Sequence, residues 1–136
     1  MEAAMINLAA IFIGGGLGAT ARYILSYGVT QLAFFSKVPL GTLVVNALGS
    51  LLIGFFFQMF QSLMVPAYIR VGVAVGFIGA FTTFSTYVLE IVQLITRRQY
   101  MSALLTFVLQ NLFGFAMVIT GVLLAEVLLN YAKGGL

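Results

Sequence analysis

The stretch Gly76-Phe-Ile-Gly-Ala-Phe-Thr-Thr-Phe-Ser-Thr-Tyr87 lies near the middle of a long apolar segment and carries four hydroxyl side chains within five positions. Glycine and clustered serine or threonine favour backbone that leaves the helix, and membrane proteins tolerate such backbone where it is buried in protein or lines a cavity. We therefore predict a helix that is broken at about residues 79–83. The alternative is an ordinary helix in which each hydroxyl donates to a carbonyl of its own preceding turn.

The rest of the chain has the composition of an integral membrane protein. Of its 136 residues, 62% are hydrophobic and only 7% are charged, whereas a soluble domain carries about a quarter charged residues. Four segments are long and apolar enough to cross a bilayer, which takes about 20 residues. The predicted fold is all-α, one transmembrane domain over residues 1–136 with helices at about residues 5–29, 40–61, 69–95 and 102–129.

Composition also excludes several classes of function. The chain has no cysteine and no histidine, which excludes disulfides, thiol nucleophiles and histidine-based acid–base chemistry. No two acidic residues are placed as a catalytic pair, so we expect a transport protein and not an enzyme. The net charge of +3 is small, and its longest basic run is Arg97-Arg98, which argues against a nucleic-acid partner.

Basic residues divide almost evenly between the two ends of the predicted bundle. Arg70 and Lys133 fall at the end that holds both termini, and Lys37, Arg97 and Arg98 fall at the opposite end. Arg22 joins the second group if it lies near the helix end, so the count is two against three or four. Orientation in a membrane follows the excess of basic residues on one side, and this excess is slight. The sequence is therefore compatible with insertion in either orientation.

Two pairs of glycines have the spacing that lets helices approach closely in lipid. Gly14 and Gly18 form one G-x-x-x-G pair, and Gly72 and Gly76 form the other. Four helices alone leave little room for an ion path, so an oligomer is the easier solution. Packing within one subunit and contact between two subunits both remain open for these glycines.

Polar side chains at membrane depth are candidate functional residues, because unsatisfied hydrogen-bonding groups are costly there. Asn46 is the lone amide in the middle of the second segment, where it suits either interhelical packing or a donor to a ligand. Arg22, near the end of the first segment, either reaches the interface or provides a positive vestibule for an anion. Glu90 follows the predicted break by about two turns. The fourth segment carries a polar strip of Thr106, Gln110 and Asn111.

Aromatic residues alternate with the hydroxyls of the third segment. Phe84 and Tyr87 are three positions apart, so they share a face where the chain is helical. The edge of an aromatic ring is positive and can face an anion. A row of phenylalanines alone usually reflects packing, but this one adjoins a polar strip in an apolar span.

Three motifs together resemble the CrcB/Fluc fluoride channels of microbial membranes. They are Gly15-Gly-Leu-Gly-Ala-Thr-Ala-Arg-Tyr23, Gly41-Thr-Leu-Val-Val-Asn-Ala-Leu-Gly49 and the run from Gly76 to Glu90. The resemblance covers nearly the whole chain in helix number, order and spacing. It implies a passive fluoride channel that exports fluoride across the cytoplasmic membrane and confers fluoride resistance. It also implies an antiparallel, dual-topology homodimer with two narrow pores.

The resemblance further assigns roles to individual residues. The backbone carbonyls of Gly79 and Thr82 from each subunit would hold a structural sodium ion at the dimer interface. Arg22 and Glu90 match positions that we assign to a vestibule or to gating. The residues that would line the fluoride pore are Asn46, Phe84, Ser85, Thr86, Tyr87, Thr106 and Gln110. Tyr87 departs from the family pattern, which usually has phenylalanine there.

Two other functions remain as alternatives on the sequence. A proton-coupled small multidrug-type exporter also has four helices, but it needs a carboxylate deep in the bundle, and no acidic residue lies in the middle of the first two segments. A scaffold subunit without transport activity would leave the polar stretch of the third segment unexplained. A partner encoded by a paralogous, oppositely oriented chain is an alternative to the homodimer.

Overall fold

The structure is a computed structural model that describes residues 1–33 and 35–134. Within these residues every regular element is a helix. The elements are α1 (Glu2–Leu32), α2 (Leu40–Ser62), α3 (Ala67–Val71), the π-helix η1 (Gly72–Ile78), α4 (Gly79–Phe81), α5 (Phe84–Thr96) and α6 (Tyr100–Ala132). Helices are expected here because a bilayer offers no water to backbone groups. The N–H and carbonyl groups of an apolar segment must therefore hydrogen-bond to each other.

Four helical spans of the described chain are long and apolar enough to cross a membrane: α1, α2, the run Ala67–Thr96 and α6. This confirms the prediction of an all-α membrane protein with four spans. Most ends of the spans reach slightly further than predicted, because the helices continue past the most apolar residues into the connecting segments. Many large apolar side chains are exposed, among them Phe12 and Phe115, as expected for a surface that faces lipid.

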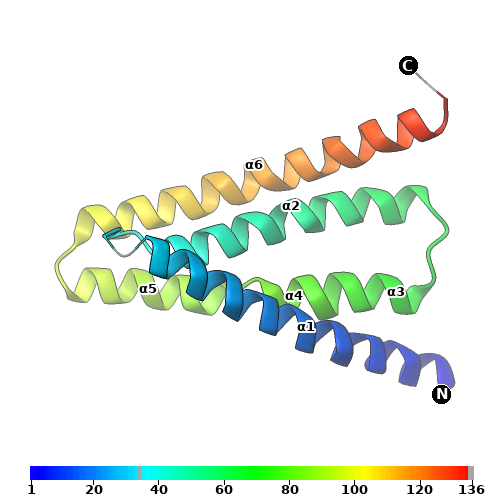
Figure 1. Ribbon diagram of the computed structural model, residues 1–136, viewed down its shortest axis with the longest axis horizontal. Coiled ribbons are helices and arrows are strands. Elements are labelled where there is room, and N and C mark those ends of the chain that lie inside the picture. Colours follow the sequence, from blue (N-terminus) through cyan, green and yellow to red (C-terminus); the bar gives the residue numbers. More distant parts are fainter. Residues whose placement is uncertain (34, 135–136) are drawn as a thin grey trace.

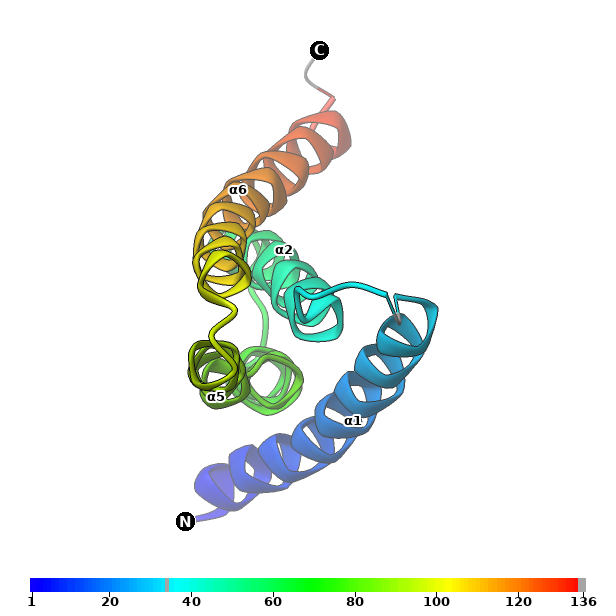
Figure 2. The same ribbon diagram turned by 90° about the vertical axis from the view of Figure 1, so that its left-hand side faces the viewer.

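The spans are arranged with both termini at one end of the bundle (Figure 1). Seen along the bundle, α2 and the run from α3 to α5 lie between α1 and α6 (Figure 2). The closest packing joins α2 to α6 and α1 to η1. The third span thus has α1 on one side and, through α5, meets α6 on the other.

Both predicted glycine pairs are used within this one chain. A Cβ added to Gly76 would lie 2.9 Å from the carbonyl oxygen of Ile11 and 3.2 Å from the Cα of Gly14. A Cβ added to Gly18 would collide with the backbone of Phe77. The glycines of α1 and η1 therefore face each other and bring the two backbones into direct contact. Of the two alternatives, the structure places this contact inside the subunit.

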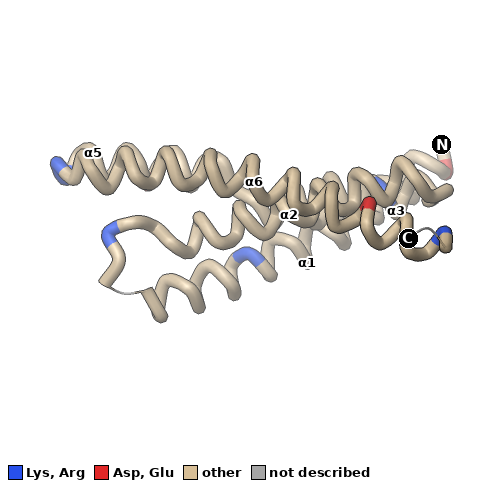
Figure 3. The backbone as a smooth tube through the Cα atoms, turned by 90° about the horizontal axis from the view of Figure 1, so that it is seen from above, with Lys and Arg blue, Asp and Glu red and all other residues tan. Residues whose placement is uncertain are grey.

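Basic positions lie mainly at the two ends of the bundle, with one on α1 away from both ends (Figure 3). Lys37 precedes α2, and Arg97 and Arg98 follow α5, at the end opposite the termini. Arg70 lies in α3, and Lys133 follows α6, at the end that holds the termini. The distribution agrees with the near balance that the sequence indicates.

Candidate functional site

The third span leaves helical geometry at two consecutive threonines. Thr82 has φ −83° and ψ 160°, and Thr83 has φ −149° and ψ 112°, so both are extended. The N–H of Thr82 still donates to the Ile78 carbonyl at 3.0 Å, and its hydroxyl donates to the same carbonyl at 3.1 Å. The N–H of Thr83 instead donates to Oδ1 of Asn46 at 2.8 Å. The series of helical backbone hydrogen bonds therefore stops between these two residues.

Asn46 of α2 replaces the hydrogen bonds that Thr83 loses from the helix. Its Oδ1 accepts from the Thr83 N–H, and its Nδ2 donates to the Thr83 carbonyl at 3.1 Å. The same Nδ2 also donates to Oε1 of Gln110 at 3.3 Å. An amide group has one carbonyl oxygen and two N–H donors, so all three are engaged. Asn46 thereby joins α2, the extended threonines and α6.

Thr83 also begins the next helix. Its Oγ1 accepts from the N–H of Thr86 at 3.3 Å and donates to the Thr86 hydroxyl at 2.8 Å. A threonine at this position satisfies one of the N–H groups that a helix leaves unpaired in its first turn. The remaining donors of that turn give the start of α5 a partial positive charge. This start lies next to Asn46.

The two aromatic residues of α5 have different surroundings. The ring of Phe84 is 76% exposed, whereas Tyr87 is only 7% exposed. Their ring centroids are 5.7 Å apart with planes at 61°, an edge-to-face arrangement. The Tyr87 hydroxyl accepts from Nδ2 of Asn111 at 3.2 Å, and the same Nδ2 donates to the Phe107 carbonyl at 2.7 Å. The extra hydroxyl at position 87 therefore has a partner on α6.

The polar residues of α6 divide into two kinds. Thr106 and Gln110 are both buried, as expected for residues that share a face. The Thr106 hydroxyl donates to the Ser102 carbonyl within its own helix at 2.7 Å. Gln110 instead reaches α2, where its Oε1 accepts from Asn46. Its Nε2 is buried and has no partner among the described residues.

Arg22 lies deeper in the bundle than the sequence suggests. The prediction placed it near a helix end, but α1 continues to Leu32, so Arg22 lies well inside the helix. Its guanidinium donates to the Thr82 carbonyl at 3.4 Å. The apolar segment alone did not show that α1 runs on through Thr30 to Leu32. The position of Arg22 therefore places a positive charge beside the extended threonines.

Glu90 is paired with a residue that the sequence analysis missed. The Thr42 hydroxyl donates to Oε1 of Glu90 at 2.6 Å, and Thr42 is buried at the start of α2. Oε2 of Glu90 is buried without a partner among the described residues. A signal was present in the sequence, because Thr42 precedes Asn46 by four positions and so shares its helix face.

Two hollows adjoin the extended threonines, and Thr83 lines both. One, of about 360 Å³, lies between α1, α2 and the start of α5 and is lined by Arg22, Thr42 and Thr86. The other, of about 390 Å³, lies between α2 and the third span and is lined by Asn46, Gly79 and Phe84. The pairing of Asn46 with Thr83 therefore lies between two spaces.

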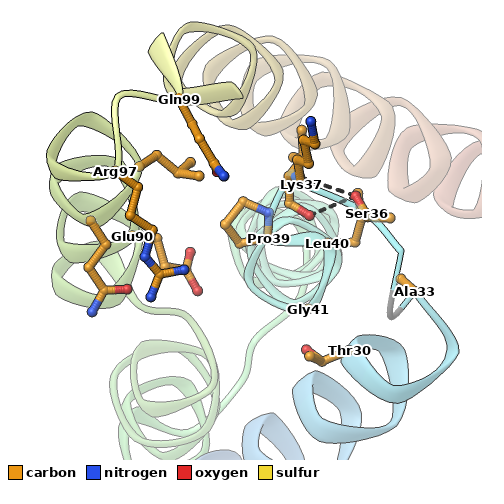
Figure 4. A pocket seen from close by; sticks show the side chains of 13 residues that line it. Thr30, Ala33, Ser36, Lys37, Pro39, Leu40, Gly41, Glu90, Arg97 and Gln99 are labelled. Carbon is orange, nitrogen blue, oxygen red and sulfur yellow. Dashed lines mark hydrogen bonds between the residues drawn. The ribbon is translucent and has the colours of Figure 1, made fainter. Parts of the chain in front are cut away.

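A third hollow, of about 390 Å³, opens at the end of the bundle where α1 joins α2. Glu90, Arg97 and Gln99 reach into it from α5 and the connection that follows it, and Lys37 lies on the side where α1 joins α2 (Figure 4). Ser36 holds the connecting segment by donating to the Val38 carbonyl at 2.9 Å. This hollow combines two basic side chains with one carboxylate, which suits the entrance to a path for a small anion.

The predicted site residues are therefore only partly gathered together. Hydrogen bonds join Asn46 to Thr83 and to Gln110. A further hydrogen bond joins Arg22 to Thr82, the neighbour of Thr83. Phe84, Ser85 and Thr86 follow on the first turn of α5 and are exposed. Thr106 shares the buried face of α6 with Gln110, but its donor stays within the helix. Glu90 belongs to the separate contact with Thr42.

The backbone near Gly79 and Thr82 offers oxygen atoms that could hold a cation. In a continuous helix the Thr83 N–H would donate to the Gly79 carbonyl, but it donates to Asn46 instead. The Gly79 carbonyl therefore lacks its helical donor. The Thr82 carbonyl accepts one long bond from Arg22, and a carbonyl oxygen has a second lone pair. Carbonyl oxygens are hard ligands that suit a hard cation, although the charge of Arg22 opposes one at Thr82.

Comparisons with known proteins give a consistent result. A family model described as "CrcB-like protein, Camphor Resistance (CrcB)" matches residues 9–122. A curated relative named "Fluoride-specific ion channel FluC", from Hydrogenobaculum sp. (strain Y04AAS1), is 38% identical over 117 residues, covering 85% of this chain and 94% of that protein.

Two further relatives carry the same name. The protein from Pyrococcus furiosus is 40% identical over 121 residues, covering 88% of this chain and 96% of that protein. The protein from Magnetococcus marinus is 45% identical over 102 residues, covering 74% of this chain and 81% of that protein.

Proposed function

The chain belongs to the CrcB-like family, and on that premise we propose that it is a fluoride-selective passive ion channel. Its relatives are named as fluoride-specific ion channels, so the family is one of channels and not of enzymes. The structural observation that carries the proposal is the interruption at Thr82 and Thr83. It places polar backbone and the exposed residues Phe84, Ser85 and Thr86 inside a membrane span.

The mechanism that we propose is replacement of water by donors along a narrow path. Fluoride is small and strongly hydrated, so a pore must offer hydrogen-bond donors wherever it removes water. The hydroxyls of Ser85 and Thr86 and the amides of Asn46 and Gln110 would serve in this way, with Thr106 further along α6. The ring edges of Phe84 and Tyr87 would stabilise the partly dehydrated ion. The path would exclude chloride by its width.

The charged groups would act at the entrances. Arg22 lines a hollow that opens beside Thr83, and a positive side chain there would raise the local concentration of an anion. Glu90 lies between this region and the hollow at the end of the bundle. We assign Arg22 to a vestibule and Glu90 to gating of the path.

We propose further that the working channel is an antiparallel, dual-topology homodimer in the cytoplasmic membrane of a microbe. One observation supports a partner. The exposed hydroxyl of Ser85 lies inside a membrane span, where lipid offers it no hydrogen bond. Both glycine pairs are already used between α1 and η1, so the partner would contact other surfaces. Such a channel would export fluoride that accumulates as HF in acidic surroundings, and so confer fluoride resistance.

A structural sodium ion at the dimer interface is the remaining part of the proposal. The Gly79 and Thr82 carbonyls of each subunit would hold it, and the free Gly79 carbonyl supports this assignment. The ion would stay in place and help to join the subunits. The comparisons do not favour the alternative of a proton-coupled multidrug-type exporter.

Fluoride efflux from liposomes tests the proposed function. The purified protein is reconstituted into liposomes loaded with potassium fluoride, and a fluoride electrode records efflux after valinomycin is added. Liposomes loaded with potassium chloride provide the comparison. We expect fast fluoride efflux without chloride efflux and without a requirement for a proton gradient. Chloride efflux at a similar rate, or fluoride efflux that needs a proton gradient, would contradict the proposal. Absence of efflux from folded protein would point to a missing partner chain or to an inactive pore.

A further inference from the structure

We propose that the groove between α2 and the start of the third span binds one anionic phospholipid of the surrounding membrane. The phosphate of its head group would contact Arg70, and one acyl chain would lie along the apolar part of the groove. This inference goes beyond the proposed fluoride conduction and does not depend on it, because it concerns how one subunit contacts lipid.

The groove consists of two hollows that share Arg70. It exists because the third span packs closely on α1 but only lightly on α2. The first hollow, of about 210 Å³, is lined by Ile53, Phe57, Phe60 and Gln61 of α2, Arg70 of α3 and Ala74 of η1. The second, of about 530 Å³, lies at the connection between α2 and α3 and is lined by Leu63, Met64, Val65, Pro66 and Arg70.

The polarity of the groove changes with membrane depth as that of a phospholipid does. α2 ends at Ser62 and α3 begins at Ala67, both at the end of the bundle that holds the termini (Figure 1). Gln61 and Arg70 lie within one turn of these two helix ends. Ile53 lies about 14 Å deeper than the end of α2, at the rise of an α-helix. The polar groups are therefore near the membrane surface, and the apolar ones are at the depth of acyl chains.

Arg70 is available to bind an anion. Its side chain is exposed, and it forms no hydrogen bond or ion pair with the rest of the described chain. Among the described residues, no acidic side chain lines either hollow, so nothing there opposes a phosphate. A guanidinium matches two oxygens of a phosphate with parallel N–H donors. The exposed amide of Gln61 can add a donor beside it.

The basic hollow at the opposite end of the bundle is a poorer site for a phosphate. Lys37 and Arg97 line it, but so does Glu90. Oε2 of Glu90 has no partner among the described residues, and a carboxylate left unpaired repels a phosphate. The charges around the hollows therefore favour the end with Arg70.

A second copy of the chain is a poorer occupant of the groove than a lipid. An antiparallel copy would bring the opposite end of the chain to the same membrane surface, and that end carries Lys37, Arg97 and Arg98. A parallel copy would bring another Arg70. In both arrangements like charges would meet at the mouth of the groove, whereas an anionic head group complements Arg70.

Replacement of Arg70 by glutamine tests the head-group contact. The protein in detergent is titrated with phosphatidylglycerol, and native mass spectrometry counts the bound lipids. We expect saturation at one lipid per subunit, and binding to R70Q that is roughly tenfold weaker because a hydrogen bond to a charged group is lost. Phosphatidylcholine with the same acyl chains should bind more weakly than phosphatidylglycerol to the wild type. Equal binding of the two lipids would overturn the choice of an anionic lipid.

The matched control is Arg98→Gln. Arg98 is an exposed arginine that lines neither hollow of the groove, so R98Q removes the same charge from another place. Its binding of phosphatidylglycerol should equal that of the wild type. Equal losses in R70Q and R98Q would show general attraction to a basic surface and would overturn the site.

Photocrosslinking tests the position of the acyl chain without a variant. Phosphatidylglycerol with a diazirine in one acyl chain is mixed into liposomes that hold the wild type, and mass spectrometry locates the labelled residues after irradiation. We expect labels to concentrate at residues 53–60 of α2 and at Ala74. Labels spread evenly over the exposed faces of α1 and α6 would overturn the groove.

Two further measurements separate the lipid from other occupants. Excess inorganic phosphate should leave phosphatidylglycerol bound, and its displacement would show that no acyl chain is held. R70Q should remain as dimeric as the wild type in size-exclusion chromatography. A changed oligomeric state with unchanged lipid binding would identify a second copy as the occupant and overturn the proposal. A wild type without fluoride efflux would contradict the proposed function alone, because none of these measurements depends on transport.

Discussion

The third span departs from the α-helix twice, and the two departures are satisfied in different ways. Between Gly72 and Ile78 the backbone widens into the π-helix η1, while its glycines pack directly on the backbone of α1. At Thr82 and Thr83 the backbone becomes extended, and its hydrogen bonds are completed by Asn46 from α2. The first region is held by backbone contact, and the second by side chains from other helices.

This difference separates stability from function along one span. The contact between α1 and η1 leaves no space for a ligand, because even a Cβ at Gly18 would collide with Phe77. The extended threonines adjoin two hollows and lie beside a buried donor without a partner. Changes at the glycines should therefore alter folding, and changes just beyond Thr83 should alter ion flux. Three substitutions test this separation.

The largest effect should come from Phe84→Ile. We expect fluoride efflux to be abolished, because isoleucine removes the positive ring edge beside the path. The protein should remain folded and dimeric, because Phe84 is largely exposed and contributes little to the packing of its own subunit. Efflux from liposomes and size-exclusion chromatography would measure the two properties.

The control for this substitution is Phe115→Ile on α6. Phe115 is 74% exposed, close to the exposure of Phe84, but it is outside the proposed path. Its replacement should leave efflux unchanged. An undiminished fluoride efflux from F84I would contradict the aromatic part of the mechanism.

The next largest effect should come from Gly18→Ala, and it should appear as loss of stability. A Cβ at this position would force α1 away from the Phe77 backbone, and forced overpacking costs about 1–3 kcal/mol. Gly16→Ala is the matched control, because a Cβ there meets nothing within 4 Å. Thermal unfolding in detergent would compare them. Equal melting temperatures for the two variants would show that the contact between α1 and η1 can accommodate a methyl group at position 18.

The smallest effect should come from Thr83→Val. The substitution keeps the shape and the preference for extended backbone but removes the hydroxyl that accepts from the Thr86 N–H. Loss of such a helix cap costs about 1 kcal/mol. In Thr82→Val the lost hydroxyl donates to a carbonyl that already accepts a backbone N–H, so stability should change less. Chemical unfolding would rank the two variants, and the opposite order would exclude capping by Thr83.

Several parts of the site could be predicted from the sequence because they depend on residue type. A lone asparagine in an apolar helix must find partners in the membrane, and Asn46 does so. The four-residue spacing placed Thr106 and Gln110 on one buried face. The same reasoning would have found Thr42 if it had been applied to the residue four positions before Asn46. The depth of Arg22 could not be predicted, because it depends on where α1 crosses the third span, where its guanidinium reaches the Thr82 carbonyl.

By itself, the sequence determined that the surface of this protein faces lipid and that its fold is four helices. With so few charged residues, the surface must face lipid. Four apolar segments in lipid must form helices, because no other open structure satisfies the hydrogen bonds of its backbone within the segment. It also determined which polar residues lie at membrane depth, since their positions in the sequence fall inside the apolar segments.

Only the tertiary structure decided how those polar groups are paired. The sequence left open whether the glycine pairs join helices within a subunit or between subunits, and the packing of α1 on η1 decided it. It also left open whether Asn46 presents a donor to a ligand. That depends on the backbone angles of Thr83 and on the distance to Gln110. Hydrogen bonds between helices depend on positions in space that the spacing of residues along one helix does not specify.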